Sequence, residues 1–316
     1  MRKQCWSILL FAFIISISCN ENNLKSPLAT LKNEHLKVTV KKTGAEIISI
    51  LLLEDNTEYL WQGDSITWSD HAIVQFPIIG NLKDNRYQYK DSYYEMMSHG
   101  FSRISEFYIK EQSDTQIIYE LKNNKLTEPL YPFKFIFHIV YSLEGKSIKI
   151  DFKVSNPSEE EMYFSLGYHP GFNCPLKIGE SMSDYFLEFS EVEHVDRLLM
   201  KDNLIDSIQS NYLSDTNKIQ LDKSLFQEDA IILKNIKSTS LALKNHINEK
   251  SVTMTFGQVP YLGIWSPKKF GDFVCIEPWH GIPDRREASQ KLQEKEGIIE
   301  LKPNESFNWD CKITIN

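Results

Sequence analysis

Apolar and polar residues alternate along most of the chain. Clear examples are residues 36–40, 133–139 and 147–154. Because successive side chains of a β-strand point to opposite faces, this period of two predicts half-buried strands. Further strands are predicted at 45–53, 107–110, 116–121, 185–189, 230–233, 240–243, 252–256, 263–265, 273–276, 297–301 and 311–315.

Helical periodicity is weak by comparison. Outside the first 18 residues, no stretch keeps an apolar stripe over three turns, and only 190–211 and 289–296 are candidates for short helices. Residues 190–223, rich in Asp, Asn and Ser, are predicted as one long loop, with patterned strands resuming beyond it. We therefore predict an all-β protein, a large antiparallel β-sandwich forming one domain over residues 28–316.

The N-terminus has the features of a secretory signal. Arg2 and Lys3 precede an apolar run over 6–17, which is shorter than the roughly 20 residues of a membrane-spanning helix. Cys19, after Ser16-Ile17-Ser18, resembles the acylated cysteine of a bacterial lipobox, with plain cleavage as the alternative. We predict a signal peptide over 1–18, lipidation at Cys19, a polar tether over 19–27, and an exported protein anchored to a membrane through lipid alone, periplasmic or at the cell surface.

Composition and charge narrow the classes of partner. The 316 residues carry 35 Lys and Arg against 43 Asp and Glu, a net charge of -8. No dense basic tract is present, so nucleic acid is not an expected partner.

The cysteines indicate neither a disulfide framework nor a zinc site. Beyond the signal and Cys19, three widely spaced cysteines without a Cys-x-x-Cys motif predict buried free thiols and no zinc knuckle: Cys174, Cys275 and Cys311.

Four segments place a polar or ionisable residue beside Gly or Pro at the predicted end of a strand. Loops at strand ends commonly present functional side chains on a rigid scaffold. These segments are 76–82, 98–103, 166–172 and 275–284.

Three of these segments resemble signature segments of a known protein family. His-Gly-Phe-Ser-Arg at 99–103, Gly-Tyr-His-Pro-Gly-Phe at 167–172 and Cys-Ile-Glu-Pro-Trp at 275–279 resemble the signature segments of the aldose 1-epimerases, or galactose mutarotases, and especially their divergent epimerase-like branch. Supporting matches lie at 225–230, 260–266 and 296–303. The resemblance implies a β-sandwich whose concave face binds a sugar, and an isomerase that interconverts α and β anomers without a cofactor or metal.

The resemblance also implies roles for single residues. Glu277 falls on the catalytic base, His169 on the catalytic acid and His99 on a substrate-contacting histidine. Ring opening needs a base for the anomeric hydroxyl and an acid for the ring oxygen, so we expect an ionised Glu277 and a protonated His169. Other candidates for contact with the sugar are Asn81, Arg103, Tyr168, Trp265 and Trp279.

One position departs from the family pattern. Many members carry an arginine where this chain has Asn81, and Arg103 or Arg86 is a candidate to supply the missing charge. The usual substrate affinity, or activity itself, depends on that replacement.

Several alternatives remain open. A non-catalytic carbohydrate-binding lipoprotein would not need the acid–base pair. A hexose-phosphate mutarotase would need cations such as Lys268, Lys269, Arg285 or Arg286, and a glycosidase would need a second carboxylate, for which Asp284 is the candidate.

Single residues also have alternative roles. Glu277 could instead neutralise Arg285, and His280 could join His99, His169 and Glu277 around a metal. The partner is a small-molecule sugar, and the oligomeric state is not predicted.

Overall fold

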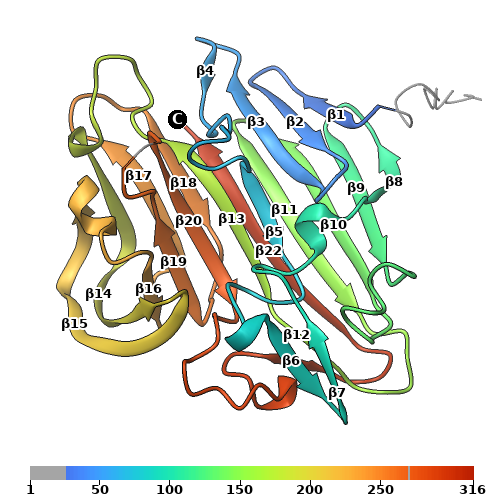
Figure 1. Cartoon of the computed structure of the whole chain (residues 1–316). Coiled ribbons are helices and arrows are strands. Elements are labelled where there is room, and N and C mark those ends of the chain that lie inside the picture. Colours follow the sequence, from blue (N-terminus) through green and yellow to red (C-terminus); the bar gives the residue numbers. More distant parts are fainter. Residues whose placement is uncertain (1–25, 270) are drawn as a thin grey trace, which may run out of the picture.

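A large antiparallel sheet forms the body of the molecule (Figure 1). The structure is a computed structural model and describes residues 26–269 and 271–316. The sheet has 14 strands, in the order β5-β13-β20-β19-β16-β14-β17-β18-β22-β11-β10-β9-β8, with β15 paired to β14. Their bounds are β5 Ala72–Gln75, β8 Tyr108–Gln112, β9 Gln116–Lys122, β10 Ile136–Glu144, β11 Ser147–Ser155, β13 Leu166–Asn173, β14 Tyr185–Lys201, β15 Leu204–Gln220, β16 Ile231–Lys234, β17 Ser240–Asn245, β18 Ser251–Thr255, β19 Tyr261–Trp265, β20 Phe273–His280 and β22 Ser306–Ile315.

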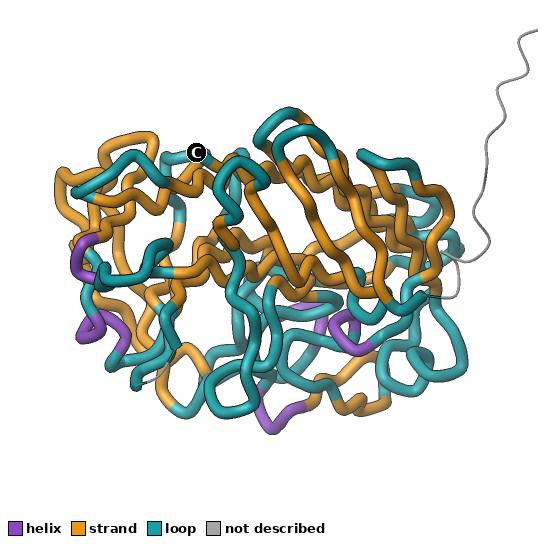
Figure 2. Tube along the Cα trace, turned by 90° about the horizontal axis from the view of Figure 1, so that it is seen from above, coloured by secondary structure: helices purple, strands orange, loops and turns teal. Residues whose placement is uncertain are grey.

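Smaller elements complete the fold. A second sheet consists of β1 (Leu28–Lys32), β2 (Leu36–Lys41), β3 (Glu46–Leu52) and β4 (Thr57–Glu58). Two ribbons pair β6 (Arg86–Tyr89) with β7 (Ser92–Glu95), and β12 (Met162–Phe164) with β21 (Ile299–Leu301). Short 3-10 turns are η1 Lys83–Asn85, η2 Ser102–Ile104, η3 Met182–Asp184, η4 Lys223–Phe226 and η5 Leu292–Glu294. Figure 2 shows that most loops and short turns gather on one side of the strands.

One continuous apolar core joins the two sheets. The strands that alternate in sequence also alternate in burial, as in β2 and β10, and their inward side chains belong to a single cluster. Phe76 packs against several aromatic rings in this core, among them Phe101 and Phe137. The Tyr141 hydroxyl donates to the Ala45 carbonyl at 2.7 Å, which ties β10 to the start of β3. The prediction of an all-β fold with a large antiparallel sheet is confirmed.

The region predicted as a loop with candidate helices is instead the longest hairpin of the molecule. Strands β14 and β15 pair over residues 186–220, and Asp202 and Asn203 form a turn in the left-handed conformation. The polar composition was misleading because β15 pairs with β14 alone and exposes most of its side chains. The other helix candidate, 289–296, contains only the single turn η5.

The third and fourth candidate segments are largely strands and not loops. Residues 166–172 lie in β13, and 275–280 lie in β20. The glycines of these segments suggested turns, but Gly167 in β13 instead makes room for the Trp279 ring, as does Gly263 in the neighbouring strand. A Cβ on Gly167 or on Gly263 of β19 would lie 2.7 Å from the Trp279 ring. Glycine within a strand commonly marks such a close approach.

Some N-terminal predictions fall outside the described residues. The signal peptide, Cys19 and nearly all of the tether belong to 1–25. Over 26–269 and 271–316, no helix is long and apolar enough to cross a membrane. In the same part of the chain Cys174, Cys275 and Cys311 are buried free thiols, as predicted.

Candidate active site

Strand register brings His169 and Glu277 together. Strands β13 and β20 are antiparallel, with Gly167 opposite Trp279 and Gly171 opposite Cys275. This register places His169 directly across from Glu277, with both side chains on the same face of the sheet. On its other side Glu277 faces Gly263 of β19, and the absence of a side chain there makes room for the Trp279 ring.

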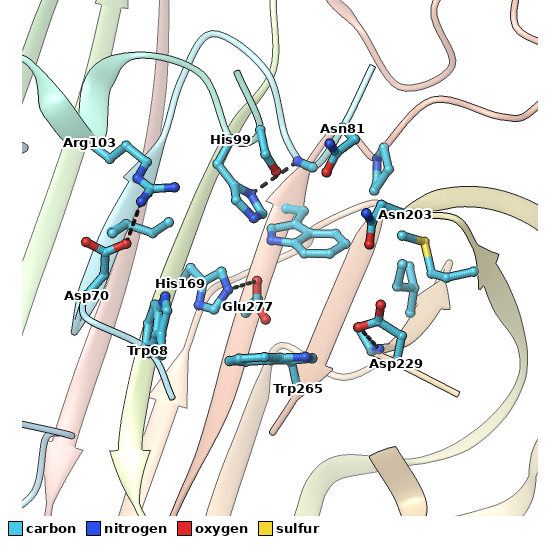
Figure 3. A pocket seen from close by; sticks show the side chains of 18 of the residues that line it. Trp68, Asp70, Asn81, His99, Arg103, His169, Asn203, Asp229, Trp265 and Glu277 are labelled. Atoms are coloured by element: carbon cyan, nitrogen blue, oxygen red, sulfur yellow. Dashed lines mark hydrogen bonds and ion pairs between the residues drawn. The ribbon is translucent and has the colours of Figure 1, made fainter. Parts of the chain in front are cut away.

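A cavity of about 470 Å³ opens over these two residues. Its size is ordinary for a pocket that binds a small molecule. Its walls come from loops far apart in sequence that meet above β13, β19 and β20 (Figure 3). Of the residues predicted to contact a sugar or act on it, the pocket is lined by Asn81, His99, Arg103, His169, Trp265, Glu277 and Trp279.

His169 and Glu277 form a close, buried pair. His169 Nε2 lies 3.1 Å from Glu277 Oε2, and the two side chains are 8% and 2% exposed. Buried polar atoms beside this pair that lack a hydrogen-bond partner within the described residues include His169 Nδ1 and Gln75 Oε1. Since buried polar groups are normally satisfied, this concentration of unpaired atoms marks a place where a polar ligand can bind.

The protonation of the pair differs from the sequence-based expectation. Burial, with a smaller effect of the nearby Asp229, raises the pKa of Glu277 well above its usual range. Burial, with a smaller effect of His99, lowers the pKa of His169 well below its usual range. Desolvation therefore favours the neutral acid beside a neutral imidazole over the expected ionised Glu277 beside a protonated His169.

His99 is held as a neutral hydrogen-bond donor to the pocket. Its Nδ1 lies 2.8 Å from Gln75 Nε2 and accepts from the Gly80 backbone N–H at 3.2 Å. Since Nδ1 is an acceptor, the ring proton belongs on Nε2. Burial and then Arg103 lower the pKa of His99 to about 4. At neutral pH His99 can therefore bind a sugar oxygen without carrying charge.

Three tryptophans provide flat apolar walls. The Trp68 and Trp265 rings lie 4.9 and 6.0 Å from the His169 ring, and Trp279 lines the pocket beside Glu277. Aromatic faces suit the C–H surface of a pyranose. They also exclude water, which strengthens polar interactions inside the pocket.

Arg103 lines the pocket at a distance from Asn81 and is paired with an acidic residue. Arg103 Nη2 binds Asp70 Oδ2 at 2.8 Å, and Figure 3 shows this pair on the far side of His99 from Asn81. Arg86 lies over the Tyr93 ring and is not part of the pocket. Of the two arginines considered to replace the charge missing at Asn81, Arg103 lines the pocket, where it is paired with Asp70, and Arg86 does not.

Tyr168 and His280 also differ from expectation, because neighbouring residues of a strand face opposite sides. Tyr168 adjoins His169 and is fully buried in the core beside Phe152, so it does not contact the pocket. His280 adjoins Trp279, and its ring packs against Phe307 and Trp309. His280 is thus outside the proposed set of metal ligands.

The position of His280 leads to a prediction about pH. Burial lowers the pKa of His280 to about 4, so the unfolded chain binds a proton between about pH 6.5 and 4 that the folded chain does not. Stability from this residue is complete above pH 6.5 and is lost as pH falls towards 4. We expect His280→Phe to reduce the drop in melting temperature between pH 7 and 5 by about 2 to 6 °C, with unchanged activity at pH 7. Scanning calorimetry at both pH values checks this, and an equal drop in both proteins would contradict it.

Three ligating side chains do lie close together among the described residues. Single ligand atoms of His169, Cys275 and Glu277 all fall within 4.8 Å of one another. Burial raises the pKa of both Cys275 and Glu277 well above the usual range. A metal bound by this set would require Cys275 and Glu277 to lose their protons.

The groups considered for other functions lie elsewhere. Arg285 pairs with Glu296 at 2.6 Å, which rules out Arg285 as the partner of Glu277. Arg286 pairs with Asp202 and Asp206, and neither Lys268 nor Lys269 lines the cavity. Asp284 is buried against Lys295 at 2.8 Å and serves as a structural anchor.

The polar lining residues that sequence reasoning missed include Asp70, Asn203 and Asp229. Asp229 falls within the matching segment 225–230, which was the available signal for it. Arg197 Nη2 donates to the carbonyls of Asp229 and Ala230 at 3.3 and 3.2 Å and so fixes the backbone there. Asn203 had no signal, because its position depends on the unexpected hairpin.

Comparison with known proteins agrees with the fold. The aldose 1-epimerase family matches residues 27–313. Protein LacX of Lactococcus lactis subsp. lactis is 34% identical over 294 residues, covering 90% of this chain and 98% of LacX. The chain belongs to the aldose 1-epimerase, or galactose mutarotase-like, family and is similar to LacX within it.

Solved structures give the same result. A galactose mutarotase related enzyme from Lactobacillus acidophilus superposes with a TM-score of 0.86 at 34% identity, covering 92% of this chain and 97% of the other. A galactose mutarotase-like protein from Lactobacillus casei also gives a TM-score of 0.86, at 27% identity, with 92% and 100% covered.

Proposed function

We propose that this protein catalyses the interconversion of the α and β anomers of an aldose. The observation that carries this proposal is the buried His169–Glu277 pair, 3.1 Å apart at the base of an aromatic pocket. The family membership supports the same reaction class.

The neutral pair is compatible with acid–base catalysis. A protonated Glu277 beside a neutral His169 holds the same number of protons as a carboxylate beside an imidazolium. The two forms differ only in which side of the 3.1 Å contact carries the proton. Sugar hydroxyl groups that bind the unpaired atoms of the pocket would stabilise the charged form by replacing lost solvation.

From the charged form the reaction is balanced. Glu277 takes the proton of the anomeric hydroxyl, His169 delivers a proton to the ring oxygen, and the bond between that oxygen and the anomeric carbon breaks. Rotation about the first carbon–carbon bond and the reverse proton transfers close the ring as the other anomer. His99 and the aromatic walls hold the sugar throughout.

A panel of aldoses followed by polarimetry tests the proposal. Starting from one pure anomer, the purified protein should accelerate the approach to equilibrium in proportion to its concentration for at least one sugar. No acceleration for any sugar that binds would favour the alternative, a non-catalytic carbohydrate-binding protein. The phosphate-binding alternative has little support, because the one arginine of the pocket is paired with Asp70.

We also propose export and acylation at Cys19, on the basis of the charged, apolar and small residues that precede it. Metabolic labelling with a fatty acid should mark the wild type and not Cys19→Ala. Equal labelling of both would contradict acylation, and recovery of the uncleaved chain from the cytoplasm would contradict export.

A further inference from the structure

The tip of the β14–β15 hairpin reaches the active-site pocket. Asn203 occupies the turn with a φ of 63°, and its exposed side chain lines the pocket without a hydrogen-bond partner within the described residues. Asn81 lines the same pocket, and Figure 3 shows both amides on the side away from Arg103 and Asp70. We call Asn81 and Asn203 the amide wall.

A backbone junction holds the amide wall in place. The Asp284 N–H donates to the Asn81 carbonyl at 2.9 Å, and the Asp284 carbonyl accepts from the Ile205 N–H at 2.9 Å. The Asp284 carboxylate is itself fixed by Lys295 Nζ at 2.8 Å and by the Lys83 backbone N–H at 3.0 Å. One buried aspartate therefore links the segment of Asn81 to the end of the hairpin that carries Asn203.

The charges of the pocket define what this wall can bind. Arg103 is the one Lys or Arg among the lining residues, and it is paired with Asp70. Asp229 and Glu277 are further acidic lining groups, so the described residues give the pocket no unpaired cation for a phosphate or carboxylate. An amide offers both donors and an acceptor without charge, which suits hydroxyl groups.

We propose that the amide wall is a hydroxyl-binding subsite that selects uncharged aldoses by a hydroxyl remote from the anomeric carbon, with Asn203 as its determining residue. This inference rests on the proposed function, since it assumes that the anomeric carbon lies at Glu277 and His169.

Asn203→Gly tests the subsite, because glycine keeps the left-handed turn while removing the amide. For the parent aldose we expect a KM about 3- to 10-fold higher, the range of one neutral hydrogen bond, with kcat within about twofold of wild type. For the monodeoxy analogue that lacks the contacted hydroxyl, wild type and Asn203→Gly should have the same KM. Lys201→Ala, in the same turn but outside the pocket, is the matched control and should behave as wild type.

Other outcomes would overturn the subsite. An unchanged KM for all sugars would show that Asn203 does not bind the sugar. An equal increase in KM for every deoxy analogue would indicate a general disturbance of the pocket. Tighter binding of an aldose 6-phosphate than of the parent aldose would contradict selection for uncharged sugars. If the wild type accelerates no anomerisation, dissociation constants measured by calorimetry for the same variants and sugars test the subsite independently of the proposed function.

Discussion

Glu277→Gln is expected to lower kcat by at least about 100-fold while the protein still binds sugar. Glutamine keeps the shape of the protonated acid but cannot accept the proton of the anomeric hydroxyl group. Stopped-flow polarimetry gives kcat, and calorimetry with the same preparation gives sugar affinity.

The same substitution makes a prediction about stability. Since burial raises the pKa of Glu277, the folded protein keeps a proton that the unfolded chain loses above pH 4.5. The stability contributed by Glu277 is therefore present below pH 4.5 and is lost progressively as pH rises above that value. Glu277→Gln removes this loss, so we expect a melting temperature at pH 7 equal to or above that of wild type. A strongly destabilised variant with normal turnover per folded molecule would show that Glu277 is structural.

His169→Asn is the second substitution with a large expected effect. Without the imidazole no group delivers a proton to the ring oxygen, and kcat should again fall at least about 100-fold. Groups that act as a unit are strongly non-additive, so the double variant with Glu277→Gln should be little slower than either single variant. A double variant whose loss equals the product of the two single losses would contradict a shared proton-transfer step.

The all-β fold was predictable because most strands alternate clearly between buried and exposed side chains. Strand β10 is an example, with an alternating sequence and alternating burial. The β14–β15 hairpin was not predictable in this way. Its outer strand is largely exposed, so its sequence carries no apolar stripe, and its position depends on long-range contacts such as that between Ile205 and Asp284.

The site was partly predictable for a similar reason. His169 and Glu277 were identified from the family resemblance, whereas their direct opposition follows from the register of β13 and β20. Tyr168 was misplaced because the segment was read as a loop, and in a strand it must face away from His169. The neutral state of the pair depends on burial by Trp68, Trp265 and the surrounding sheet, which no local sequence pattern reports.

Exchange NMR on a mixture of one free aldose and its methyl glycoside tests the central claim most directly. The glycoside has no anomeric hydroxyl proton for Glu277 to remove, although it keeps the ring and the remaining hydroxyl groups of the free sugar. We predict faster exchange between the α and β signals of the free aldose, loss of that exchange in Glu277→Gln, and an unchanged glycoside. Exchange at the buffer rate for an aldose that binds, or release of methanol from the glycoside, would contradict the assignment of this pair to anomer interconversion.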